Sequence, residues 1–70
     1  MNINTAITEY NNMANQLHMD DNHHIHGLSD LHGLRVAKDM GRLLSLDSEA
    51  LIAIESELKH EEEIEGGDTA

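Results

Sequence analysis

The chain has 70 residues and a net charge of −10, and it contains no cysteine, proline, tryptophan or phenylalanine. A chain of this length makes one small domain, and without cysteine it has neither a disulfide nor a thiolate metal site to stabilise it. So negative a chain is repelled by phosphate backbones and anionic lipids, so we expect neither direct nucleic-acid binding nor membrane binding.

The first segment has apolar residues at helical spacing. They recur at intervals of four and three residues, at Ile3, Ile7, Tyr10, Ala14 and Leu17. This period predicts an amphipathic helix at about residues 2–18 that packs along its apolar stripe. The start, Met1-Asn2-Ile3-Asn4, lacks the basic and apolar regions of a signal peptide, so we expect a cytoplasmic protein.

A histidine-rich break follows, with turn-forming residues around His23, His24 and His26. Imidazole is a ligand for zinc and nickel, but these histidines lack a recognised ligand spacing. The pattern favours a solvated polar linker without a resident cofactor, where weak zinc or nickel binding would be adventitious. The alternative is a metal site at these three histidines, or a pH-dependent switch, since histidine titrates near neutrality.

The second predicted helix covers about residues 30–44. Ser29 is the expected N-cap, with Asp30 in the first turn. Apolar residues cover about half of its circumference, which predicts a central helix that touches two neighbours. Its basic residues Arg35, Lys38 and Arg42 share the polar face, and we expect them to pair with acids of the third helix or of a second chain.

The third predicted helix covers about residues 48–64. Asp47 is its expected N-cap, and Leu46 with Leu51 matches a hydrophobic staple. The apolar stripe of this helix ends at Leu58, and Ile52 lies off the stripe. Residues 66–70 begin with two glycines and are expected to be a disordered tail.

These elements predict an all-α fold: a small three-helix domain at residues 1–65, or a helical hairpin preceded by an N-terminal helix. The core must be built from aliphatic residues and is thin, which favours a homodimer. The residues expected to mediate self-association lie on the second and third helices: Leu34, Ala37, Gly41, Leu51, Ile54 and Leu58.

Carboxylates dominate the third helix. They form the expected protein-binding surface: Glu55, Glu57, Glu61, Glu62, Glu63 and Glu65. Such a surface is commonly a solvated, solubilising face. It can also recognise a basic protein surface, or mimic nucleic-acid phosphates in the groove of a protein that handles DNA or RNA.

No catalytic motif is present in the sequence, so we expect no enzymatic activity. The favoured function is that of an inhibitor or regulator that binds a basic protein surface stoichiometrically. Small acidic helical proteins without cysteine resemble the inhibitors that bacteriophages and mobile elements use against host nucleases, polymerases and defence complexes. Two alternatives stay open: a metal- or pH-responsive regulator using His23, His24 and His26, and an assembly or adaptor subunit that docks through Asn11, Asn12 and Asn15.

Overall fold

The computed structural model describes the backbone of residues 1–69 and the side chains of residues 1–64. In chain order its elements are α1 (Ile3–Gln16), the 3-10 helix η1 (Asp21–His23), α2 (Leu31–Leu43) and α3 (Ser48–Thr69). The described residues include three α-helices and no strand, which confirms the predicted all-α class. The tail predicted at residues 66–70 lies outside the residues described in full and stays a prediction.

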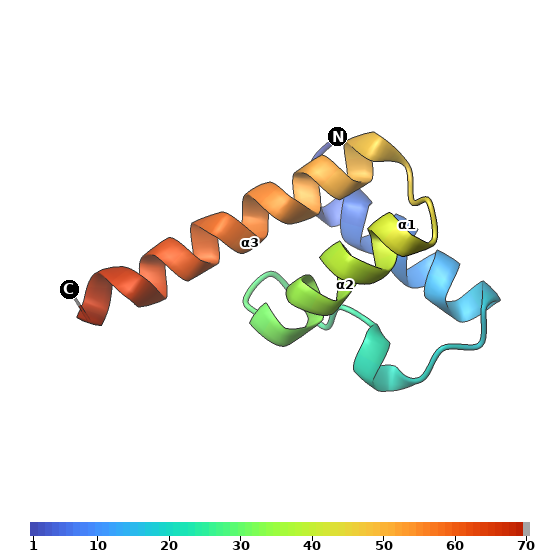
Figure 1. Ribbon diagram of the computed structural model, residues 1–70, viewed down its shortest axis with the longest axis horizontal. Coiled ribbons are helices and arrows are strands. Elements are labelled where there is room, and N and C mark those ends of the chain that lie inside the picture. The colour runs from blue at the N-terminus through green and yellow to red at the C-terminus, as the bar shows by residue number, and fades with distance from the viewer. Residues whose placement is uncertain (70) are drawn as a thin grey trace.

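The two shorter helices pack on the third. α1 and α2 each contact α3, and α2 also contacts η1, so α3 holds the central place that the sequence predicted for the second helix. Figure 1 shows α3 running past both partners and projecting from the packed body. The molecule is accordingly elongated, with extents of 40 × 23 × 19 Å.

The core lies where the three helices meet. Its fully or almost fully buried side chains come from α1, the histidine-rich loop, α2 and α3: Ala6, Tyr10, Ala14, Ile25, Leu34, Ala37, Ala50, Ile54 and Leu58. Tyr10, the only aromatic residue, is the largest group in this core. Burial of aliphatic and aromatic surface is the main term that stabilises so small a domain.

This core already uses the residues predicted to mediate self-association. Leu34, Ala37, Gly41, Ile54 and Leu58 are buried within one chain, and Leu51 is half-buried. Side chains that face their own core cannot also face a second copy unless the fold opens. The homodimer stays a prediction, and its interface would have to use other residues.

The same backbone motif ends α1 and α2. His18 (φ 57°) and Ser45 (φ 62°) adopt the left-handed conformation directly after the C-cap residues Leu17 and Leu44. The amide of Met19 then donates to the Ala14 carbonyl at 2.9 Å, and the amide of Leu46 donates to the Gly41 carbonyl at 2.8 Å. These i→i−5 bonds are those of the Schellman motif, which satisfies carbonyls left free at a helix end.

The start of α2 differs by one residue from the prediction. Asp30, not Ser29, is the N-cap, and its Oδ1 accepts from the Gly33 amide at 3.0 Å. The other carboxylate oxygen accepts from the His26 amide at 2.9 Å, which ties the cap to the preceding loop. The two oxygens of this carboxylate thus accept from one amide of the loop and one of the helix, whereas a serine side chain has a single oxygen.

The turn between α2 and α3 packs against Gly41, near the end of α2. A Cβ at Gly41 would lie 3.2 Å from Leu46 Cδ2 and 3.2 Å from Leu51 Cδ1, so both leucines of the predicted staple pack against this residue. The apolar face of α2 is narrower than predicted, since Leu43 is 75% exposed. Among the described residues, no helix is both long enough and apolar enough to span a bilayer.

Candidate protein-binding surface

α3 has one packed face and one open face. Ala50 and Ile54 are fully buried and Leu58 is almost so, and the next turn on this side brings Glu61. The packed face therefore loses its apolar residues after Leu58, as the sequence predicted. On the open face, Ile52 is 63% exposed and Ile64 is 52% exposed. Exposed aliphatic side chains on one face of a helix are available for contact with another molecule.

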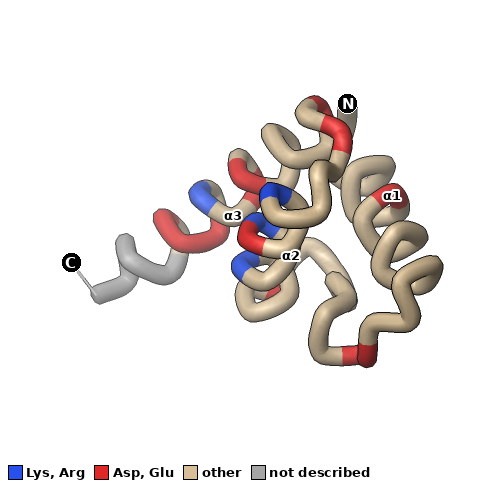
Figure 2. The backbone as a smooth tube through the Cα atoms, turned by 45° about the vertical axis from the view of Figure 1, so that its right-hand side comes forward, with Lys and Arg blue, Asp and Glu red and all other residues tan. Residues whose placement is uncertain are grey.

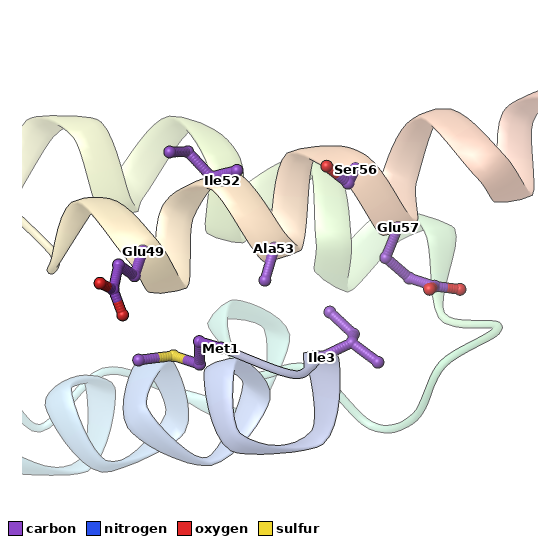
Figure 3. A pocket seen from close by; sticks show the side chains of 7 residues that line it. All are labelled: Met1, Ile3, Glu49, Ile52, Ala53, Ser56 and Glu57. Atoms are coloured by element: carbon purple, nitrogen blue, oxygen red, sulfur yellow. The ribbon is translucent and has the colours of Figure 1, made fainter.

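A shallow groove of about 550 Å³ lies between the start of α1 and the first half of α3. Its lining is apolar with acidic and polar groups at the rim: Met1, Ile3, Glu49, Ile52, Ala53, Ser56 and Glu57. In Figure 3, Ala53 points from α3 toward α1, where Ile3 and Met1 lie. Glu49 and Glu57 lie at the two ends of the view, so the groove has a carboxylate at each end.

The α3 residues of this groove begin a stripe that continues along the helix. Positions 49, 52, 53, 56 and 57 are followed at the same spacing by His60, Glu63 and Ile64. Residues three and four apart share one face of a helix, so the groove and the projecting part of α3 present one continuous surface. His60, Glu63 and Ile64 are all exposed. This surface, residues 49–64 of α3 on the side of Met1 and Ile3, is called the open face below.

Two of the acids predicted to bind a partner form ion pairs with arginines of α2. Arg42 Nη2 donates to Glu55 Oε1 at 2.6 Å, and Arg35 donates to Glu62 Oε2 from Nη2 at 3.0 Å and from Nε at 3.2 Å. The expectation that the bases of the second helix pair with acids of the third is confirmed for Arg35 and Arg42, while the described residues show no such pair for Lys38. The Arg35–Glu62 pair is exposed and the Arg42–Glu55 pair is partly exposed, so each stabilises the fold by at most about 1 kcal/mol. Their effect is to take these arginines away from any phosphate ligand.

The remaining predicted acids lie along α3 without such partners. The described residues include no ion-pair partner for Glu57, Glu61 or Glu63. Glu63 is exposed, Glu57 and Glu61 are half-exposed, and Glu65 lies outside the residues whose side chains are described. Figure 2 shows acidic residues on α3 beyond the point where the basic residues of α2 lie against it. Lys59 is the one lysine or arginine in the described part of α3, so carboxylates outnumber bases where α3 projects.

The histidine-rich loop is ordered against α1, so its prediction as a solvated linker was wrong. The Tyr10 hydroxyl donates to the His23 carbonyl. Asn11 makes two bonds with Ile25: its Nδ2 donates to the carbonyl at 2.9 Å, and its Oδ1 accepts from the amide at 2.9 Å. Ile25 is only 4% exposed. An amide side chain can satisfy both backbone groups of one residue, and here it fixes the loop so that Ile25 enters the core.

His24 adds a further connection between the loop and α1. Its Nδ1 donates to the Asp20 carbonyl at 2.8 Å, and its Nε2 lies 2.8 Å from Asn15 Oδ1. Asn11 and Asn15 were predicted to dock an adaptor onto a larger complex, but both hold the chain's own loop. Of that asparagine face only Asn12 is exposed and free of these bonds. The asparagine face therefore offers a partner less than predicted.

The three histidines of the loop do not converge. His23 Nδ1 lies 2.5 Å from Asp20 Oδ1, while His26 Nε2 donates to the Asp21 carbonyl at 3.1 Å. The hydrogen bond from His23 lowers the pKa of the Asp20 carboxyl. Among the described residues, no three histidine, aspartate or glutamate side chains are arranged to hold a metal ion. The metal site at His23, His24 and His26 stays a prediction that this geometry does not favour.

Two features are not predicted from the sequence: the groove, and the two hydrogen bonds by which Asn11 holds Ile25, called the loop clamp below. The spacing of Ile52, Ala53 and Ser56 is a signal for a second face on α3, but the contribution of Met1 and Ile3 depends on how α1 crosses it. The signal for the clamp was Ile25, a lone large aliphatic residue among histidines.

Comparisons of the chain with protein-family models, with curated proteins and with solved structures found no match, so its function has to be inferred from this geometry.

Proposed function

We propose that the protein acts by stoichiometric binding to a basic surface of another protein, and that α3 makes the contact. One observation carries this proposal: α3 projects from the domain with carboxylates that have no ion-pair partner among the described residues. Beyond Leu58, the described part of α3 places no buried side chain in the core, and in a chain of net charge −10 we propose that this segment serves binding. One chain per target is sufficient for this mode.

Electrostatics determine what such a surface selects. A dense negative potential raises the association rate with basic partners and disfavours acidic ones, and salt weakens both effects. Proteins that handle nucleic acids carry extended basic surfaces, so we propose a protein of this class as the target. Occupying that surface would exclude nucleic acid, so the proposed effect is inhibition. We propose the cytoplasm of a cell invaded by a bacteriophage or mobile element as the setting.

The test is affinity capture from a lysate of the organism that encodes the chain, at low salt, with identification of the proteins that elute as salt rises. The informative variant is Glu61→Gln with Glu63→Gln, which removes two unpaired charges from α3. The control is Asp21→Asn with Asp39→Asn, which changes the net charge equally at exposed positions of η1 and α2, outside α3.

We expect the wild type and the control to retain the same basic proteins, which the α3 variant loses. Neutralising an exposed carboxylate should not unfold the domain, because surface substitutions of this kind usually alter stability by less than about 0.5 kcal/mol. If the two variants capture the same proteins to the same extent, net charge alone would account for binding and the assignment to α3 would be wrong.

A further inference from the structure

We propose that the groove between α1 and α3 receives an amphipathic helical segment of the partner, with apolar side chains in the groove and basic side chains against Glu49 and Glu57. This inference rests on the proposed function and deepens it, because it names the part of a basic protein that is recognised. Three features of the open face carry it: its apolar lining, its charges and its length.

The apolar lining brings side chains from the start of α1 and from α3 together at one site. Met1, Ile3, Ile52 and Ala53 lie together at one site, and Ile52 is 63% exposed although it is a large aliphatic side chain. Single exposed aliphatic residues are ordinary on protein surfaces. A contiguous apolar patch with a polar rim is instead typical of interaction sites. A partner that contributed only charged side chains would leave this apolar patch exposed to water.

The charges at the rim of the groove determine which sign of charge a bound segment must carry. Glu49 and Glu57 lie at the two ends of the groove, and the described residues provide neither with an ion-pair partner. A second copy of the chain would bring its own acidic face and its own net charge of −10 to the same place. Like charges placed across an interface cost several kcal/mol. The charge pattern therefore selects a basic, heterologous segment.

The length of the open face matches a helix better than a single side chain. From Glu49 the stripe runs through Ser56 and His60 to Ile64, with a residue at each turn. At a rise of about 1.5 Å per residue this is on the order of 20 Å of surface. Helix-in-groove recognition uses anchors three, four and seven residues apart on the incoming helix, which is the spacing this stripe offers.

Two synthetic peptides test the inference against the full chain by isothermal titration calorimetry. The first consists of leucine and lysine, with leucines three and four apart so that one helical face is apolar. The second has the same composition in an order without an apolar face, so the two carry equal charge. We expect the amphipathic peptide to bind at least about tenfold more tightly than the scrambled one.

A pair of matched variants assigns the difference to the groove. Ile52→Ser removes an exposed aliphatic side chain from the open face, whereas Leu43→Ser removes one that is 75% exposed on α2. Both changes replace a surface residue of a helix, so both variants should fold. We expect Ile52→Ser to weaken binding of the amphipathic peptide by about tenfold, with little effect on the scrambled peptide. Leu43→Ser should leave both affinities unchanged.

The outcomes separate this inference from the proposed function. If both peptides bind equally and salt weakens both, the groove assignment is wrong while electrostatic binding stands. If the amphipathic peptide binds equally well at high salt and to the Glu61→Gln, Glu63→Gln variant, the apolar contacts in the groove stand, but the charged contacts at Glu49 and Glu57 and the electrostatic function are wrong. If sedimentation instead shows a dimer that Ile52→Ser dissociates, the occupant is a second copy and the inference is overturned.

Discussion

Replacing Asn11 with alanine is expected to destabilise the fold substantially, because this one side chain satisfies both backbone groups of Ile25. The two hydrogen bonds are 2.9 Å long and join α1 to a loop residue that is 4% exposed. Leaving a buried backbone group without a partner costs about 1–3 kcal/mol. Since these bonds are partly buried, water can replace some of the loss, and we expect about 2–4 kcal/mol in total.

This cost is large for so small a domain. At about 0.05–0.15 kcal/mol per residue, a chain of this length has a free energy of unfolding of roughly 4–10 kcal/mol. Asn12→Ala is the matched control: the same residue type, one position along the same helix, exposed and outside the clamp. Alanine favours a helix in both variants, so the difference between them isolates the hydrogen bonds.

Urea unfolding followed by far-UV circular dichroism measures the difference. We expect Asn11→Ala to lower the midpoint strongly at a similar slope, and Asn12→Ala to leave it unchanged or slightly raised. Amide hydrogen exchange at Ile25 should accelerate in Asn11→Ala alone. Equal midpoints for the two variants, with unchanged protection of Ile25, would refute the idea that Asn11 holds the loop.

Three further predictions concern titration and packing. Burial raises the pKa of Tyr10, so the stability it contributes is present below about pH 10 and lost as the pH rises through the raised value. Tyrosinate absorbance reports this group alone, and it should appear together with unfolding. Burial tends to raise the pKa of Asp30, but the amides of His26 and Gly33 outweigh it and hold that pKa below its usual value. Its stabilisation is therefore present above about pH 4 and lost as the pH falls through the lowered value, an acid transition that Asp30→Asn should weaken. Gly33→Ala should lower the unfolding midpoint although alanine favours helices, because its Cβ would lie 2.3 Å from Asp30 Oδ2 and 3.0 Å from the His24 carbonyl oxygen.

Helical periodicity predicted the elements well because each helix buries a stripe that repeats along its own sequence. Tyr10 and Ala14 of α1 are buried as expected. Leu17 belongs to the same stripe, yet it is 51% exposed, because the chain leaves the helix at Gln16 and turns through the left-handed conformation of His18. The stripe alone does not indicate where such a turn occurs.

The features that were not predictable from the sequence depend on contacts between residues that are far apart in the chain. The bonds of Asn11 to Ile25 span 14 residues, and asparagines on a helix predict a polar face rather than a clamp. In the same way, the glutamates of α3 look alike in sequence. Only the packing of α2 against α3 shows that Glu55 and Glu62 are paired, while Glu63 has no ion-pair partner within the part of the chain that the structure describes. The acidic character of the binding surface was predictable, but its apolar groove was not.

The most direct test of the open face as the binding surface is a backbone NMR titration of the labelled chain with the amphipathic leucine–lysine peptide. Shift changes should concentrate on Ile3, Ile52, Ser56, His60 and Glu63, and residues of the histidine-rich loop and Leu43 of α2 should be unaffected. The opposite result, with changes on α2 and the loop or spread evenly over the chain, would contradict the assignment of binding to α3.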